Sequence, residues 1–328
     1  MIQVNLFVSG DTGYSNRLNS TKVALKEFFQ IKEKNKSKIK LNVYCNQIKE
    51  NQWTDILTSI PELKTISTDL ILMPDDGYMR KVHHISTTDA EYTSKWDDDV
   101  FINRYVWDYL IENVNVLDDD RYFSLAPIFT NGIPSVELFI EDFLNTEERS
   151  EAYRIFMEDG VVPSIWNCNY TKVNNYIKSL STWNGVEYWR RVEANNQAEN
   201  MGLPWYFDRV KGVHPARFSD RYNNFILDFV IRNSEKVFEK GNYYLDTDYF
   251  TPYWCNNLSV FKTSFYLESQ KEFFDHWDEG QMNTLAIKRN QVPVYVRNSF
   301  GIHMAYGCTK NQKEIENRYC NEFFGKYL

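Results

Sequence analysis

The chain has 328 residues, with 37 basic and 45 acidic side chains and a formal net charge of −8. Nonspecific nucleic-acid affinity comes from clustered lysines and arginines, so this acidic balance argues against a nucleic-acid partner. The hydrophobic fraction of 43% is ordinary for a soluble globular protein, and no apolar run approaches the roughly 18 residues that a transmembrane helix needs.

Aromatic side chains make up 16% of the chain. Their rings suit the C–H faces of sugars, but the composition also fits an AT-rich genome, viral or otherwise. The five cysteines are scattered, odd in number and without metal-ligand spacing, which argues against a disulfide framework or structural zinc; they are Cys45, Cys168, Cys255, Cys308 and Cys320. A reducing, cytoplasmic setting is therefore expected, and the N-terminus lacks the basic and apolar regions of a signal peptide.

The first hundred residues carry the signals of an α/β fold. Apolar runs and alternating patterns predict strands at residues 2–9, 40–46, 69–73 and 82–86. Helical periodicity predicts helices at residues 16–33 and 103–113. Strand, helix and strand at this spacing predict a parallel βαβ unit, which places the first two strands side by side.

The segment from Lys95 to Asn103 carries three consecutive carboxylates between apolar residues. Adjacent carboxylates repel one another, so a fold that presents them together usually supplies a cation. Alternate residues of an extended segment point the same way, so Asp97 and Asp99 are expected to reach one ion. Two carboxylates with open positions suit Mg²⁺ or Mn²⁺ that also holds a diphosphate. The competing interpretation is a solvated acidic turn.

The same segment resembles the Asp-x-Asp motif of glycosyltransferases with the GT-A fold. The similarity is greatest to the β-1,3-galactosyltransferase and Fringe family (family 31), whose signature reads roughly Lys-x-Asp-Asp-Asp-Val-Phe-Val-Asn. The resemblance implies a Rossmann-like α/β fold with a mixed, mainly parallel sheet, in which Asp97 and Asp99 hold Mn²⁺ (or Mg²⁺) on a nucleotide-sugar, with UDP as the expected nucleotide. Family 31 enzymes are typically Golgi membrane proteins with an N-terminal anchor, and the start of this chain departs from that pattern.

In open α/β sheets, ligands gather at the carboxyl ends of the strands. The loop after the first predicted strand is therefore expected to lie beside the acidic triplet. Ser9 and Asp11 of this loop are candidate donor-binding residues, and Tyr14 is a candidate to stack on the nucleotide base.

The segment 131–245 has helical periodicity and few strand signals. It predicts helices at residues 135–144, 147–158, 171–180, 185–199 and 220–240. We expect three parts: a nucleotide-sugar-binding α/β part at 1–130, a largely helical insertion at 131–245 and a completion of the core at 246–328. The insertion suits an acceptor-binding wall, a structural lid or an oligomer surface.

Strand signals return at residues 243–245, 257–261 and 292–296, with a helix predicted at 279–290. The segment from Tyr249 to Cys255 is similar to the Tyr-Pro-x-Tyr-Cys stretch that precedes the catalytic acid in family 31, although an aromatic core loop is the alternative. The resemblance then implies Glu279 or Asp278 as the base that takes the proton of an acceptor hydroxyl. Asp278 also suits a helix cap.

A late histidine completes the candidate site. GT-A enzymes often place a further metal ligand where His303 stands, and neutral imidazole suits Mn²⁺. Lys310 is a candidate for a phosphate contact. The spacings after Asp278 and His303 are also similar to those of retaining family 8 enzymes, so the stereochemistry stays open. A second Asp-x-Asp at Asp246 competes for the metal, but it lies beyond the predicted insertion.

The sequence therefore predicts a metal-dependent hexosyltransferase that moves a sugar from a nucleotide-sugar to a hydroxyl of a glycan acceptor. Inversion is implied by the family 31 resemblance. Two alternatives remain: a metal-dependent nucleotidyl or phosphoryl transferase that uses the same carboxylates, and a noncatalytic carbohydrate-binding protein that uses the aromatic residues.

Overall fold

The computed structural model describes residues 1–9, 17–46, 48–64, 68–73, 89–132, 135–158, 219–233, 241–249, 254, 257–272, 282–283, 285–286, 288–304 and 312–325. The strand predicted at 82–86 and the helices predicted at 171–180 and 185–199 lie outside these residues. In the part that is described, no helix is long and apolar enough to cross a membrane.

The first half of the chain alternates strands and helices. In order, these are β1 (Ile2–Ser9), α1 (Arg17–Phe29), α2 (Glu33–Lys36), β2 (Ile39–Asn46), α3 (Glu50–Ser59), the 3-10 helix η1 (Pro61–Lys64), β3 (Thr68–Met73), β4 (Tyr92–Asp97), β5 (Val100–Ile102), α5 (Arg104–Asn113), the 3-10 helix η2 (Val114–Asp118) and β6 (Tyr122–Phe129). The helix predicted at 16–33 corresponds to α1, which ends four residues earlier at Phe29, and α2 begins at Glu33.

The second half contains more helix. Its elements are α6 (Ser135–Phe143), α7 (Thr146–Glu158), α11 (Asp220–Arg232), β7 (Tyr244–Asp246), β8 (Leu258–Lys262), α13 (Thr263–Glu272), β9 (Val292–His303), α15 (Gln312–Arg318) and the π-helical segment η5 (Tyr319–Phe324). Helices α6, α7 and α11 begin within one residue of the predicted positions, which confirms the helical character of these pieces of the segment 131–245.

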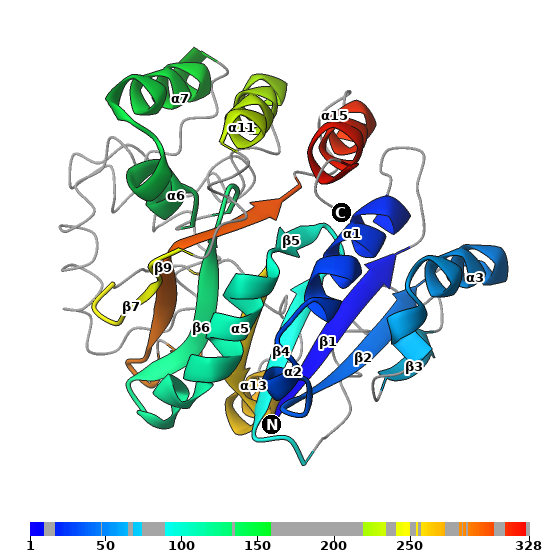
Figure 1. The fold of residues 1–328 in the computed structure, drawn as a ribbon. Coiled ribbons are helices and arrows are strands. Elements are labelled where there is room, and N and C mark those ends of the chain that lie inside the picture. The colour runs from blue at the N-terminus through cyan, green and yellow to red at the C-terminus, as the bar shows by residue number, and fades with distance from the viewer. Residues whose placement is uncertain are drawn as a thin grey trace.

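One mixed sheet holds the nine described strands in the order β3-β2-β1-β4-β8-β6-β9-β5, with β7 paired to β9. The longer ladders are parallel: β3, β2, β1 and β4 run together, and β6 runs with β9. Strands β5, β7 and β8 pair antiparallel with their neighbours. Figure 1 shows helices on both faces of this sheet. The predicted α/β fold with a mixed, mainly parallel sheet is therefore confirmed.

Successive side chains of each strand point to opposite faces of the sheet, and both faces are buried. On β1, Leu6 and Val8 point into a hydrophobic cluster that also contains residues of α1, α3 and α5. Phe7, between them, points into a second cluster with residues of α6, α7, α11 and α13. Because both faces are covered, the central strands are buried along almost their whole length, as is usual for parallel strands.

Three aromatic rings fix the end of β4 against two helices. Trp96 of β4, Phe28 of α1 and Trp107 of α5 pack against one another with ring centroids 5.0–5.4 Å apart. All three side chains are almost fully buried. Such mutual packing holds the residues that follow Trp96 in a defined place relative to α1.

The carboxyl ends of β1 and β4 lie side by side because these strands are parallel neighbours, with Phe7 opposite Asp97. From β1 the chain runs through α1 to β2 on one side, while β4 lies on the other side of β1. This is the kind of strand-order reversal at which α/β proteins bind ligands. The expectation that Ser9 and the acidic triplet share one edge of the sheet is confirmed.

Candidate functional site

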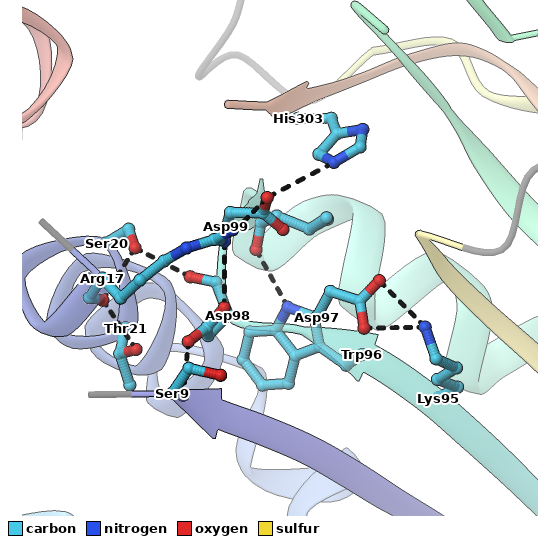
Figure 2. A network of polar contacts seen from close by, with 11 residues as sticks. Ser9, Arg17, Ser20, Thr21, Lys95, Trp96, Asp97, Asp98, Asp99 and His303 are labelled. Carbon is cyan, nitrogen blue, oxygen red and sulfur yellow. Dashed lines mark hydrogen bonds and ion pairs between the residues drawn. The ribbon is translucent and has the colours of Figure 1, made fainter. Parts of the chain in front are cut away.

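The acidic triplet is not one extended segment. Strand β4 ends at Asp97, Asp98 and Asp99 form a turn, and β5 begins at Val100. Residues in a turn do not alternate as strand residues do, so the expectation that Asp97 and Asp99 point the same way is wrong. The three carboxylates leave the backbone toward different neighbours (Figure 2).

Four hydrogen bonds stabilise this turn. Inside the segment, Trp96 Nε1 donates to Val100 O at 2.9 Å. Ser20 Oγ of α1 donates to Asp98 O at 2.9 Å. Met304 N, directly after β9, donates to Asp99 O at 2.9 Å. Asp97 N donates to Asn257 O, directly before β8, at 3.1 Å. The turn is therefore held by parts of the chain that lie far apart in sequence, which favours a fixed geometry.

Asp97 is paired with Lys95, two residues earlier on β4. Lys95 Nζ donates to both carboxylate oxygens of Asp97, at 2.7 and 2.9 Å, and is itself almost fully buried. The Asp97 side chain retains 19% exposure. The structure does not bring the Asp97 carboxylate into the group formed by Asp99 and His303.

Asp98 points back toward β1 and α1. Its Oδ2 accepts a hydrogen bond from Ser9 N at 2.7 Å, and its Oδ1 lies 3.1 Å from Arg17 Nη1. Burial raises the pKa of Asp98 to about 7, because it outweighs the opposing effect of the Arg17 charge. Asp98 thus anchors Ser9, the last residue of β1.

Asp99 is the carboxylate that meets the predicted histidine. Its Oδ2 lies 3.5 Å from His303 Nε2 and 2.7 Å from Arg17 Nη1. Burial disfavours its charged form, but the positive charge of Arg17 and the contact with His303 outweigh burial and hold the pKa well below the usual range. Asp99 therefore stays a carboxylate with almost no contact with solvent.

The register between β5 and β9 explains how His303 reaches Asp99. In this antiparallel pair, Val100 lies opposite His303, so the last residue of β9 is next to the residue that precedes β5. His303 N also donates to Thr130 Oγ1 at 3.3 Å. A short strand that follows the acidic turn thus brings together two residues that are 204 positions apart.

The Asp99–His303 pair fits a divalent ion in part. Metal–ligand bonds of about 2.1 Å place two donors of one ion no more than about 4.2 Å apart, and the observed separation is 3.5 Å. A carboxylate oxygen with an imidazole nitrogen suits Mn²⁺. Among the described residues, however, no group of three or more His, Cys, Asp or Glu side chains is arranged to hold a metal. Two protein ligands are enough only where a bound diphosphate and water supply the rest.

Several predicted site residues lie outside the part of the chain that the structure describes. These are Asp11, Tyr14, Asp278, Glu279 and Lys310. Their roles in donor binding and proton abstraction remain predictions. Of the remaining predicted site residues, Ser9, Asp99 and His303 are brought to one edge of the sheet, while Asp97 lies at that edge with its side chain held by Lys95.

The competing acidic residues have structural partners. Asp246 on β7 forms an ion pair with Arg297 of β9 at 2.9 Å, and Arg297 also pairs with Asp142 of α6. In the segment similar to Tyr-Pro-x-Tyr-Cys, Trp254 is buried, and Asn283 hydrogen-bonds both its N and its O. For the residues described there, the aromatic core interpretation fits.

Sequence reasoning missed Arg17 and gave Asp98 no role of its own. Arg17 is the first residue of α1, the helix that comes next after β1 in the chain. The rule that placed Ser9 at the carboxyl edge of the sheet also places the start of the next helix there. That rule is the signal that would have found Arg17.

No protein-family model and no curated protein matches the sequence. Among solved structures, the chain is similar to the galactosyltransferase LgtC in complex with donor and acceptor sugar analogues, at 11% identity over 99% of this chain and 95% of that chain, with a TM-score of 0.35. It is also similar to residues 1–349 of TarS from S. aureus, at 11% identity over 39% of this chain and 35% of that chain, with a TM-score of 0.28. A third is the CMP:2-keto-3-deoxy-manno-octonic acid synthetase complexed with CTP, at 9% identity over 45% of this chain and 61% of that chain, with a TM-score of 0.29. The chain thus spans about a third of the length of TarS 1–349. The family 31 assignment is not confirmed, and the function rests on the site itself.

Proposed function

We propose that this protein is a metal-dependent glycosyltransferase of the GT-A fold. It moves a sugar from a nucleotide-sugar, with UDP as the expected nucleotide, to a hydroxyl group of a glycan acceptor. The observation that carries the proposal is the meeting of Asp99 and His303, 3.5 Å apart and both about 2% exposed, beside the carboxyl ends of β1 and β4. This is where an α/β sheet with this strand order binds its ligand.

Asp99 and His303 are the residues that would hold the ion, Mn²⁺ or Mg²⁺. When bound, such an ion supplies stabilisation of the negative charge that grows on a leaving nucleotide diphosphate. The low pKa of Asp99 keeps this ligand ionised. Its backbone bond from Met304 N, together with the register of β5 and β9, keeps it beside His303.

The other residues orient the donor and the acceptor. Asp98 holds Ser9 N and so fixes the end of β1, which the predicted donor-binding residues follow in the sequence. Asp97, oriented by Lys95 at the same edge of the sheet, would contact the donor, as the motif resemblance implies. Glu279 or Asp278 takes the proton from the acceptor hydroxyl as its oxygen bonds to the anomeric carbon and the nucleotide diphosphate leaves, and this single displacement inverts that carbon.

The first test is Asp99→Asn, which removes the charge with little change in shape. Transfer should fall by about a hundredfold or more, since such losses are typical when an electrostatic group of the transition state is removed. The rise in melting temperature that UDP causes in the presence of Mn²⁺ should also disappear, because a ligand stabilises the fold only through its binding to the folded state.

Asp120→Asn is the matched control, because Asp120 ends a second run of three aspartates at residues 118–120 and its side chain is 99% exposed. The reaction itself is identified by its product: glycosyl transfer from a UDP-sugar releases UDP, whereas nucleotidyl transfer releases pyrophosphate. Normal turnover by Asp99→Asn would show that the metal site is misplaced. A wild-type protein that no nucleotide-sugar stabilises with Mn²⁺ would remove the proposed function altogether.

A further inference from the structure

Arg17 occupies the position between the two carboxylates of the turn (Figure 2). Its Nη1 lies 3.1 Å from Asp98 Oδ1 and 2.7 Å from Asp99 Oδ2. Asp99 Oδ2 is also the oxygen that lies 3.5 Å from His303 Nε2. The guanidinium therefore contacts the same atom that the proposed function assigns to the divalent ion.

A guanidinium and a divalent cation cannot both bind that oxygen well. An ion at a normal bond length from Asp99 Oδ2 would lie within a few ångströms of Arg17 Nη1, and the repulsion between like charges is strong where water is excluded. The Asp99 side chain is 2% exposed and that of Arg17 15% exposed. Asp99 therefore pairs with Arg17 or with the ion, but not with both at full strength.

The charge of Arg17 has to be neutralised in either case. Burial disfavours a charged guanidinium without an anionic partner, and the carboxylates of Asp98 and Asp99 supply that partner in the structure. Arginine does not lose its proton in proteins. If the ion binds Asp99, then Asp98 is the carboxylate that still pairs with Arg17. A second anion is then needed to replace the negative charge that Asp99 had supplied to Arg17.

A nucleotide diphosphate is the anion that the site would receive. The planar guanidinium matches phosphate oxygens in geometry as well as in charge. Ser20 Oγ lies 2.8 Å from Arg17 O and 2.9 Å from Asp98 O, and its single proton is shared between these two carbonyl oxygens, which holds the Arg17 backbone beside the turn. The exchange of partners would therefore take place by rotation of the Arg17 side chain, with its backbone in place.

We propose that Arg17 neutralises Asp99 while the donor site is empty, and that it releases Asp99 to the divalent ion and binds the diphosphate when the donor enters. This inference rests on the proposed function, because it requires that metal and nucleotide share the site. It makes the two ligands cooperative: the ion alone must displace Arg17 without giving it an anion, whereas the ion and the diphosphate together satisfy both cations.

The test compares wild type, Arg17→Gln and Arg121→Gln by calorimetric titration with Mn²⁺ alone and with UDP at saturating Mn²⁺. Arg17→Gln should bind Mn²⁺ alone about tenfold more tightly and UDP about tenfold more weakly than wild type, a coupling of ordinary size. Arg121 pairs with Asp119, and its side chain is 73% exposed, so Arg121→Gln should behave as wild type.

The two proposals fail in different ways. In one outcome, the wild-type protein binds both Mn²⁺ and UDP, but Arg17→Gln binds Mn²⁺ no more tightly than wild type does. This would overturn the role of Arg17 and leave the proposed function standing. Wild-type protein that binds neither ligand would overturn both proposals.

A second measurement uses the wild-type protein, so it does not depend on the folding of a variant. Phenylglyoxal modifies accessible arginine side chains, and peptide mass spectrometry locates the product. Mn²⁺ alone should increase modification of Arg17 several-fold, and addition of UDP should suppress it, while Arg121 serves as the internal control. Modification of Arg17 that does not respond to bound Mn²⁺ would contradict the exchange.

Discussion

At the scale of single residues, the buried charges near the site are held in short pairs. Lys95 is bonded to Asp97, and Arg17 lies between Asp98 and Asp99. A buried ion pair adds little net stability, because desolvation of both charges offsets their attraction. What such pairs do provide is orientation: each carboxylate has one defined direction before any ligand arrives.

Glu27 of α1 is a buried carboxylate outside these pairs. It is 5% exposed, and its Oε1 accepts a hydrogen bond from Arg104 N, the first residue of α5, at 2.8 Å. Burial raises the pKa of Glu27, and the hydrogen bond and charge of Arg104 only partly oppose it. The folded protein therefore holds this proton to higher pH than the unfolded chain does.

This pKa gives Glu27→Gln a pH-dependent effect. Stability contributed by protonated Glu27 is fully present below the unfolded value of 4.5 and is lost as the pH rises through the raised folded value. Glutamine accepts the same hydrogen bond without a charge. Relative to wild type, Glu27→Gln should gain stability as the pH rises, by up to about 1.4 kcal/mol per pH unit within that window. Urea unfolding at several pH values measures this, and a difference that stays constant with pH would contradict it.

At the scale of elements, the sequence predicted what local patterns encode. Strand β1 and helix α1 follow from an apolar run and a helical period. Strand β6 was missed because all eight of its residues are buried, which removes the alternation, and because it contains Pro127, a residue unusual within a sheet. The register breaks between Pro127 and Phe129, as the missing N–H would lead one to expect.

In the described part of the candidate site, the sequence identified Asp99 and His303 but did not predict which side chains contact each other. The motif nominated Asp97, Asp99 and His303, and the structure joins only the last two. The alternation argument failed because β4 ends at Asp97, and nothing local marks that boundary in a run of three aspartates. The contact of Arg17 with Asp99 joins residues 82 positions apart, and such contacts come from tertiary packing, which periodicity does not report.

Gly301 of β9 is the residue that allows β9 to approach its neighbours near the site. A Cβ built there would lie 2.5 Å from a ring carbon of Phe129 and 2.8 Å from Ile102 Cγ2. Gly301→Ala should therefore displace β9 and cost about 1–3 kcal/mol of stability. Because His303 is two residues further on, Mn²⁺-dependent UDP binding should weaken as well.

Gly325→Ala is the control for this prediction, since a Cβ there would make only an ordinary contact at 3.4 Å. Urea unfolding gives the stability, and calorimetry with UDP and Mn²⁺ gives the binding. Loss of stability with unchanged binding would mean that β9 shifts without moving His303 from Asp99.

At the scale of the whole molecule, the sheet joins two hydrophobic clusters. One cluster packs α1, α3 and α5 on one face, and the other packs α6, α7, α11 and α13 on the opposite face. The second cluster contains Phe7 of β1, Phe261 of β8 and Phe300 of β9. Helices from the segment 131–245 therefore complete the core of the sheet.

A shared sheet predicts that both faces unfold together. Phe139 of α6 and Leu110 of α5 are fully buried in opposite clusters. Phe139→Ala should cost about 3–5 kcal/mol and Leu110→Ala about 2–5 kcal/mol, and each should lower the midpoint of the same single transition, followed by tryptophan fluorescence and by far-ultraviolet circular dichroism. Tyr244→Ala, at a residue 51% exposed, should move that midpoint much less. Two separate transitions, with Phe139→Ala lowering only one, would show instead that the segment 131–245 folds as an independent domain.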